Sequence, residues 1–132
     1  MSAFTCIKLA FKDKECLKES LKEIGFTEVE EYEEAQPLMG YQGDRRAQKA
    51  NIIIRKQHVG RASNDVGFIK NKDGSYDMII SDYDRKNPLL NDKLKQTYGL
   101  MSVRKQMKRR GYIISSQKTD AQGRIKLKVM VG

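Results

Sequence analysis

Residues 66–84, VGFIKNKDGSYDMIISDYD, predict a β-hairpin and with it an antiparallel sheet. Two runs of apolar and β-branched residues flank a polar centre, as in two short strands joined by a turn. We expect Asp73–Gly74 to form this turn, because Asp-Gly tolerates the positive φ angles that tight hairpin turns require. This hairpin is the strongest local signal in the chain, and the other elements are placed around it.

The N-terminal part of the chain predicts a strand followed by a helix. Residues 3–11, AFTCIKLAF, are mostly apolar and include β-branched members, which favours a strand. Asp13 can cap the following helix, and Gly25 ends it, since glycine adopts the left-handed conformation after a helix at little cost. The apolar positions of this helix share one face: Leu17, Leu21 and Ile24.

Two further strands and a connection are expected between this helix and the hairpin. Residues 26–32, FTEVEEY, favour a strand, and residues 50–57, ANIIIRKQ, favour a more apolar strand in the centre of the sheet. Residues 33–49 are polar and contain one proline and two glycines, which indicates a long connection.

The second half of the chain predicts a long helical stretch over Leu89–Arg110. Its apolar stripe changes face near Gly99, so we expect a kink or two short helices there. A final hairpin follows, with strands at 112–117 and 124–131. The alternation of the last strand points its basic residues outward and its apolar residues inward: Arg124, Lys126 and Lys128 outward, Ile125, Leu127, Val129 and Val131 inward.

The order strand, helix, glycine, aromatic residue, strand occurs twice in the chain. It begins with TCIKLAF at residue 5 and with MIISDYD at residue 78. Two such units suit a split βαβ, ferredoxin-like sheet or a related fold. We therefore expect a single α+β domain over residues 1–132, with a mostly antiparallel sheet and two helical segments on one face.

The charge of the chain is concentrated in its second half. Residues 1–66 carry 11 basic and 11 acidic side chains, whereas residues 67–132 carry 15 and 6 and supply the whole net charge of +9. Residues 93–132 hold 11 basic side chains and the single acid Asp120. A surface this basic favours an anionic partner, and a plain solvated face is the alternative.

These basic residues define a candidate anion-binding surface. RNA or DNA, bound without sequence preference, is the anion we expect, because phosphate contacts position a chain without reading its bases. On a helix, four of these residues (104, 105, 108 and 109) point away from the apolar positions at 100, 103 and 107. The set is Lys93, Lys95, Arg104, Lys105, Lys108, Arg109, Arg110, Lys118, Arg124, Lys126 and Lys128.

A second candidate site lies in the 36–49 connection, at GYQGDRR (40–46). Glycine-rich loops can offer backbone amides to a phosphate, but this segment matches neither nucleotide-binding glycine motif. A structured turn and a loop that contacts a protein partner are the alternatives. The residues of this partner-contact loop are Tyr41, Gln42, Asp44, Arg45 and Arg46.

No catalytic or metal-binding pattern emerges. Asp82 and Asp84 alternate on a strand and could converge, but a third ligand is missing. His58 is the single histidine and lacks a nucleophile beside it in the sequence. Cys6 lies in an apolar strand, where cysteine is usually a small buried hydrophobe. We expect a non-catalytic protein with no cofactor and no metal.

The composition of the chain indicates the cellular compartment in which we expect the protein. Two cysteines without CxxC spacing indicate reduced thiols and a cytoplasmic protein, and a Cys6–Cys16 disulfide is the alternative. We expect no membrane span, since no apolar run reaches the roughly 18 residues that one needs. The sequence does not predict an oligomeric state, although the acidic run EVEEYEE (28–34) could pair with the basic region of another copy.

Several segments resemble a known family. They are MSAFTCIK at the start, GYQGD (40–44) leading into ANIIIR (50–55), and DVGF (65–68) with DGSY (73–76). In this order they are similar to the uncharacterised cyanobacterial and plastid family called hypothetical chloroplast open reading frame 35. The similarity extends over nearly the whole chain, and the glycine–tyrosine–glutamine–glycine stretch is its most specific part.

The resemblance implies an accessory protein rather than an enzyme. The family has no established activity, and its bacterial genes lie near AAA-type ATPases, which suggests a protein–protein adaptor that uses the 36–49 loop or the open sheet face. Two departures stand out, since members commonly begin Met-Ser-His-Phe and end in Arg-Trp, where this chain has Ala3 and Val131-Gly132. Relatives also carry an acidic C-terminal segment, so the basic surface is particular to this chain.

Overall fold

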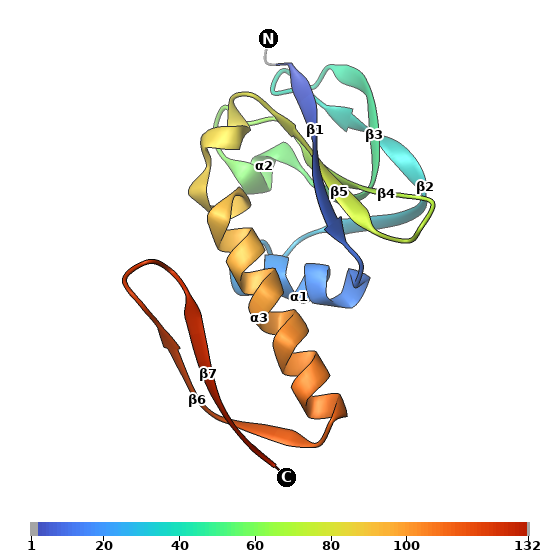
Figure 1. Cartoon of the computed structure of the whole chain (residues 1–132). Coiled ribbons are helices and arrows are strands. Elements are labelled where there is room, and N and C mark those ends of the chain that lie inside the picture. The colour runs from blue at the N-terminus through green and yellow to red at the C-terminus, as the bar shows by residue number, and fades with distance from the viewer. Residues whose placement is uncertain (1–2, 132) are drawn as a thin grey trace.

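The computed structural model describes residues 3–131, which form a five-stranded sheet, two main helices and a separate hairpin (Figure 1). The sheet has the strand order β1-β5-β4-β3-β2. Its strands are β1 Phe4–Phe11, β2 Glu30–Met39, β3 Arg45–Ile54, β4 Val66–Lys70 and β5 Tyr76–Ser81. The remaining elements are α1 Lys14–Glu23, α2 Lys56–Val59, the 3-10 turns η1 Asp84–Lys86 and η2 Pro88–Leu90, α3 Asp92–Arg109, β6 Tyr112–Thr119 and β7 Ile125–Val131.

The hairpin expected at residues 66–84 is confirmed as β4 and β5. The two strands pair antiparallel with Phe68 opposite Met78, and both side chains are buried. Gly74 has a φ of 87°, which a residue with a Cβ rarely adopts. All four strand pairs of the main sheet are antiparallel, so the sheet follows the direction set by this hairpin.

Both ends of α1 form as the sequence predicts. The Asp13 carboxylate accepts a hydrogen bond from the backbone N–H of Cys16 at 3.1 Å, which caps the first turn. At the other end, Gly25 has a φ of 112°, and its N–H donates to the carbonyl of Lys22. The N–H of Phe26 donates to the carbonyl of Leu21, which completes a Schellman motif.

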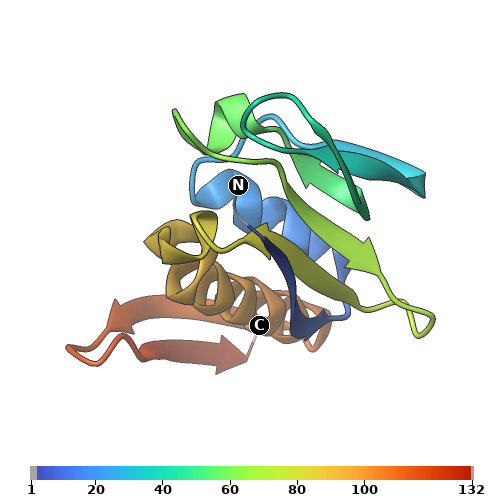
Figure 2. The same ribbon diagram turned by 90° about the horizontal axis from the view of Figure 1, so that it is seen from above.

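The main core lies between one face of the sheet and the two helices α1 and α3. In Figure 2 the sheet, the helix pair and the β6–β7 hairpin form three successive layers. Leu17 and Leu21 of α1 and Leu94 of α3 are fully buried against the sheet. The sheet contributes Ile52, Ile54, Phe68, Met78 and Ile80.

The interpretation of residues 26–57 is wrong in detail. Residues 26–29 lie outside any strand, and the expected connection is a second hairpin in which β2 and β3 pair. The helix α2 replaces the end of the expected strand at 50–57. β2 is an edge strand, so its exposed side can be polar and can carry Pro37, and such a strand lacks the apolar signal of a central one.

Helix α3 runs without a break through Gly99, so of the two expected alternatives, a kink or two short helices, the two short helices are wrong. The change of face in its apolar stripe has another cause, since α3 packs on the sheet and α1 on one side and on the β6–β7 hairpin on the other (Figure 2). Leu90 and Leu94 are buried in the core that α3 shares with the sheet and α1, whereas Leu100 and Met107 lie half-buried on a different face.

The α+β class and the mostly antiparallel sheet are confirmed. Within this class, the strand order differs from that of the split βαβ, ferredoxin-like fold. The strand after the second long helix does not return to the main sheet, because β6 pairs with β7 in a hairpin of its own alongside α3. The two repeats seen in the sequence therefore have different surroundings.

Candidate nucleic-acid interface

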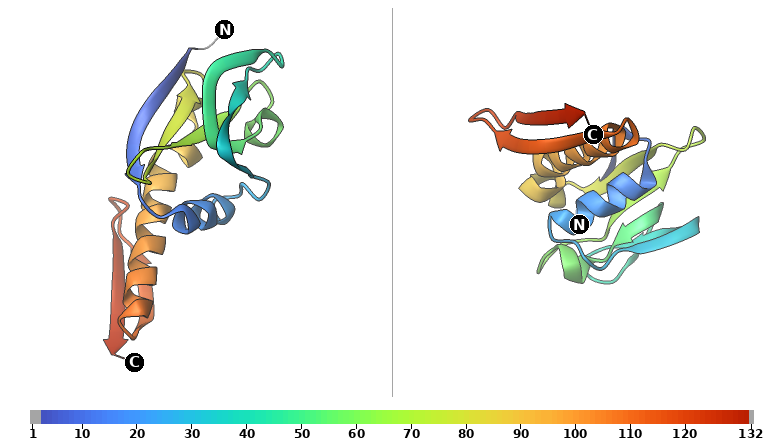
Figure 3. Two further views of the ribbon diagram at one scale, coloured as in Figure 1. Left: turned by 90° about the vertical axis from the view of Figure 1, so that its right-hand side faces the viewer. Right: turned by 90° about the horizontal axis from the view of Figure 1, so that it is seen from below.

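The net positive charge of the protein lies in one structural part, Asp92–Val131, which we call the helix–hairpin unit. It comprises α3, β6 and β7, and its lower part extends beyond the sheet (Figure 1 and Figure 3, left). Its 40 residues carry 11 basic and 2 acidic side chains, a net charge of +9. The other 92 residues carry 15 of each, so the entire net charge lies in this unit.

Two contacts dock the hairpin on α3. The Gln96 amide donates to the backbone carbonyl of Gly123 in the turn, and Arg104 donates to the side chain of Gln117 on β6. The face of the hairpin that carries Gln117 therefore lies toward α3. Lys118 and Lys126 form a cross-strand pair in the next register position, so they lie on the outer face.

The basic residues of the hairpin are exposed, as predicted. Lys118, Arg124, Lys126 and Lys128 are all exposed, and Arg124 pairs with Asp120 at 2.8 Å. Of the apolar residues expected to point inward, Leu127 is half-buried. The side chains of Ile125, Val129 and Val131 lie outside the described residues.

Three basic residues of α3, Lys105, Lys108 and Arg109, lie on another side. Lys105 Nζ is 2.5 Å from the Asp13 carboxylate, which places it beside the start of α1. Lys108 and Arg109 line hollows between α3 and the N-terminal segments of the chain. The outward-facing lysines of the hairpin and these three residues of α3 therefore form two groups with α3 between them.

Asp13 joins α1 to the basic helix. Its carboxylate accepts from Cys16 N–H and pairs with Lys105, while its backbone N–H donates to the Tyr98 hydroxyl at 3.0 Å. The hydrogen bond from Lys105 lowers the pKa of the Asp13 carboxyl, and Asp13 in turn raises the pKa of Lys105. Lys105 thus has a structural partner, unlike the exposed Lys93, Lys95 and Arg110, for which the described residues provide none.

The partner-contact loop is a short turn on the β2–β3 hairpin. Tyr41 and Gln42 are exposed at its tip, whereas Arg45 and Arg46 belong to β3. A Cβ on Gly40 would lie 2.3 Å from Asp44 Oδ1, so a larger residue here would require the Asp44 carboxylate to move. Arg46 lies over the Phe4 ring at 4.8 Å, which fixes it to the sheet.

A buried polar network that the sequence did not reveal holds this turn. Asp65 is 1% exposed and accepts hydrogen bonds at 2.8 Å from Arg55 Nη1, Met39 N–H and Lys56 N–H. Asn64, also 1% exposed, accepts from Tyr41 N–H at 2.9 Å. The sequence did show two polar residues directly before a buried strand. It did not predict their network, because their partners lie up to 26 residues away in the chain.

These contacts connect the segments that carried the family resemblance, since Asn64–Asp65 reaches both the GYQGD turn and Arg55. A comparison with protein-family models matches residues 20–128 to the family described as protein of unknown function, DUF1257. The chain belongs to the DUF1257 family. We expected an uncharacterised family, and this match confirms it. Searches of curated proteins and of solved structures found no match.

In this DUF1257 protein the matched segment begins inside α1 and ends on β7. It therefore includes the sheet strands β2–β5 and nearly all of the helix–hairpin unit. Lys12 and Asp13, which contact or adjoin α3, precede the matched segment.

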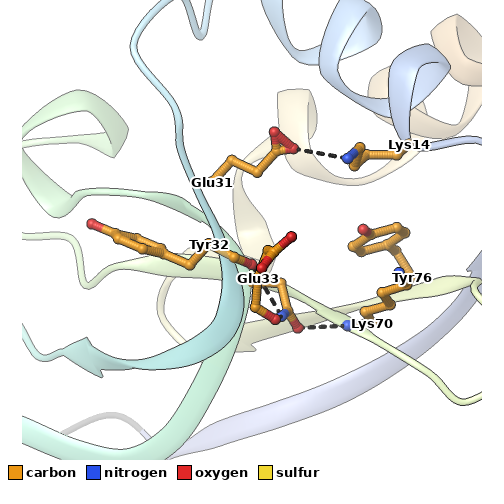
Figure 4. Close-up of a pocket in the computed structure, with 7 residues that line it drawn as sticks. Lys14, Glu31, Tyr32, Glu33, Lys70 and Tyr76 are labelled. Carbon is orange, nitrogen blue, oxygen red and sulfur yellow. Dashed lines mark hydrogen bonds and ion pairs between the residues drawn. The ribbon is translucent and has the colours of Figure 1, made fainter.

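The acidic run at 28–34 has partners within the chain. Glu31 pairs with Lys14 and Lys18 at 3.2 Å, and Glu30 pairs with Arg55 at 2.8 Å. Glu31 also lines a polar pocket of about 470 Å³ where β2 leaves β3 (Figure 4). Two lysines and two glutamates line this pocket, so it offers an anion no excess positive charge.

The remaining candidate residues do not assemble a site. Asp82 is exposed beside Arg85, whereas Asp84 is buried and accepts from Ser81, so the two carboxylates do not converge. His58 lies in α2 and pairs with Glu28. Cys6 is exposed on the edge strand β1, contrary to the prediction, because it lies on the face opposite the helices.

Within residues 3–131, three or more His, Cys, Asp or Glu side chains nowhere gather in a way that could hold a metal ion. The helices of this part of the chain also lack the length and apolarity that crossing a membrane requires.

Proposed function

We propose that this DUF1257 protein is a non-catalytic module that binds RNA or DNA through the helix–hairpin unit, without reading the base sequence. The observation that carries the proposal is the confinement of the whole net charge of +9 to 40 residues that extend beyond the sheet. Such a charge steers a polyanion toward the unit and releases condensed counterions when it binds. The rest of the chain, with balanced charges, serves as the scaffold.

The aromatic residues of the unit support binding without sequence preference. Tyr98 and Tyr112 are its only aromatic residues. The Tyr98 ring stacks on Phe11 with centroids 3.9 Å apart, so one of its faces is already covered. Tyr112 is half-buried. Phosphate contacts from lysine and arginine therefore carry the interaction in this proposal.

We propose that this binding takes place in the cytoplasm. Cys6 and Cys16 are both free thiols, as expected for a reducing compartment.

The test is binding of a 3′-labelled single-stranded RNA of mixed sequence to the full chain over a salt series. We expect affinity to fall steeply with salt, with a log–log slope of about −0.7 per phosphate contact. Lys118→Glu with Lys126→Glu should weaken binding on the hairpin side, and Lys108→Glu with Arg110→Glu should do so on the helix side. Lys105 is left unchanged, because it is paired with Asp13.

The matched control is Lys22→Glu with Lys49→Glu, which changes the net charge by the same amount on exposed positions of α1 and β3. If the control weakens binding as much as the unit variants do, the attraction is a property of net charge alone. If the wild-type protein fails to bind RNA or DNA at low salt, the proposal is wrong.

The rival function is a protein–protein adaptor, for an AAA-type ATPase among other partners. One observation favours it, since Tyr41 is 44% exposed on a turn whose backbone is held by Asn64 and by Lys56. An exposed aromatic side chain on a rigid turn is typical of a contact point with another protein. A partner that is lost in Tyr41→Ala and retained after nuclease treatment would favour this function over nucleic-acid binding.

A further inference from the structure

A pocket of about 440 Å³ lies between the end of β1 and the C-terminal half of α3. Ala10, Lys12 and Asp13 form one wall, and α3 provides the other. Ala10 has a φ of 53°, the one positive φ outside glycine among the described residues, so the backbone of this wall is held in an uncommon conformation. The volume falls in the range of small-ligand pockets.

The charges around the pocket favour an anion. Lys12, Lys105 and Arg109 line it, against the single carboxylate of Asp13. Lys105 already neutralises that carboxylate. Lys12 and Arg109 are exposed and form no hydrogen bond or salt bridge within the described part of the chain, although Lys12 lies near enough to Asp73 to help lower the pKa of that carboxyl. Two cations are therefore available to a ligand.

Hydroxyl groups in the pocket complete the donor set. The Tyr98 hydroxyl oxygen accepts from Asp13 N–H, so its own proton is free to be donated. Stacking of Tyr98 on Phe11 keeps this hydroxyl in place. Ser102, one turn further along α3, adds a second hydroxyl to the same pocket. Charged and neutral donors that converge on one hollow suit a tetrahedral oxyanion.

The neighbouring hollow on the other side of Lys105 differs in charge. It has a volume of about 330 Å³, and Glu15 and Glu19 line it opposite Arg104 and Lys108. Lys105 lines this hollow too, but it is already paired with Asp13, so the remaining acidic and basic groups balance, as all the charged groups do in the pocket at β2. Of these two hollows beside α3, the one at Lys12 and Arg109 therefore has the larger excess of positive charge.

We propose that this pocket binds a phosphate monoester, presented by the phosphorylated end of a nucleic-acid strand that lies on the helix–hairpin unit. The inference rests on the proposed function for its ligand. A terminal phosphate carries about one charge more than an internal phosphodiester at neutral pH and has three unesterified oxygens, so it can use more donors. A strand end can also enter a hollow that a continuous strand would pass over.

The experiment compares two 3′-labelled RNAs of the same sequence, one with a 5′-phosphate and one with a 5′-hydroxyl, on the full chain. We expect the phosphorylated strand to bind about tenfold more tightly, the effect of one strong charge-assisted contact. Arg109→Ala and Lys12→Ala should each reduce this ratio toward one. The matched control is Arg110→Ala, which should weaken binding of both RNAs equally and leave their ratio unchanged, because Arg110 is exposed next to Arg109 and does not line the pocket.

A third probe, adenosine 5′-monophosphate as a competitor, distinguishes a strand end from a free nucleotide. Competition by the monophosphate as strong as by the phosphorylated RNA would overturn the strand-end assignment. Equal affinities for the two RNAs in the wild-type protein would overturn the inference and leave the proposed function standing. Failure of both RNAs to bind would overturn the proposed function and this inference together. Retention of the preference in Arg109→Ala and Lys12→Ala would exclude the pocket as its source.

Discussion

Asp13 shows how one side chain sets the position of the basic helix. Its carboxylate caps α1 through Cys16 N–H, and the same carboxylate holds Lys105, which lies 92 residues further along the chain. The sequence predicts the capping role, because an N-cap is a local pattern. It does not predict the ion pair, because nothing local relates residue 13 to residue 105.

Replacement of Asp13 separates these two roles. Asp13→Ala removes both and should lower the free energy of unfolding by about 1 to 2 kcal/mol for the lost cap. Asp13→Asn retains a good N-cap and loses the charge, so it should cost less than the alanine variant. Urea unfolding of the three proteins at neutral pH measures the two differences. A larger loss in the asparagine variant than in the alanine variant would contradict this division.

The same comparison has a defined pH dependence. Lys105 lowers the pKa of Asp13 in the folded protein, so the charged carboxylate stabilises the fold above its unfolded pKa of about 3.9. This stabilisation is lost as the pH falls through the lower, folded pKa. The difference between wild type and Asp13→Asn should therefore stay constant from about pH 5 to 7 and shrink below about pH 4.

At the scale of elements, the local signals of turns and caps predict more than the apolar pattern does. The β4–β5 hairpin, the ends of α1 and the C-terminal hairpin all follow from glycine, aspartate and alternation. β2 does not, because its polar residues lie on an exposed edge and its contacts with β3 shift register between Glu31 and Gln36. The Asn51 side-chain amide donates hydrogen bonds there to the backbone carbonyls of Tyr32 and Glu33, and no local sequence pattern predicts these contacts.

Two glycines with opposite surroundings test the packing of these elements. A Cβ on Gly67 in β4 would lie 2.4 Å from the Ala50 Cβ and 2.9 Å from Leu38, so Gly67→Ala should cost about 1 to 3 kcal/mol through overpacking. Gly99 lies inside α3 with open space around its Cα, so Gly99→Ala should stabilise the protein by up to about 1 kcal/mol. Denaturant unfolding measures both, and a destabilising Gly99→Ala would show that α3 requires glycine at this position.

At the scale of the whole molecule, the sequence predicts where the charge lies along the chain but not how it is arranged in space. Residues 93–132 are basic in any fold. Their division into two groups depends on the hairpin covering one flank of α3 while Asp13 holds the other. The pocket at Arg109 depends on Lys12 and Tyr98, which come from distant parts of the chain, so only the tertiary structure brings its donors together.

The segregation of charge also predicts how salt affects stability. Eleven basic and two acidic residues in 40 positions repel one another, and this repulsion is screened as the Debye length falls from about 30 Å at 0.01 M salt to about 10 Å at 0.1 M. The ion pairs elsewhere on the surface contribute only about 0 to 1 kcal/mol each, so their screening opposes this effect weakly. The melting temperature should therefore rise by a few degrees over that range of salt.

Neutral variants locate the source of this salt response. Lys93→Gln with Lys95→Gln and Lys126→Gln should melt at a higher temperature at low salt and respond less to added salt, because the repulsion is partly removed. Lys22→Gln with Lys49→Gln and Lys70→Gln removes as much charge from exposed positions outside the unit and should leave the response unchanged. A polyanion that binds the unit should stabilise the wild type further, by about 2.7 kcal/mol at 100 times its Kd. A melting temperature that falls with salt would mean that ion pairs outweigh the repulsion within the helix–hairpin unit.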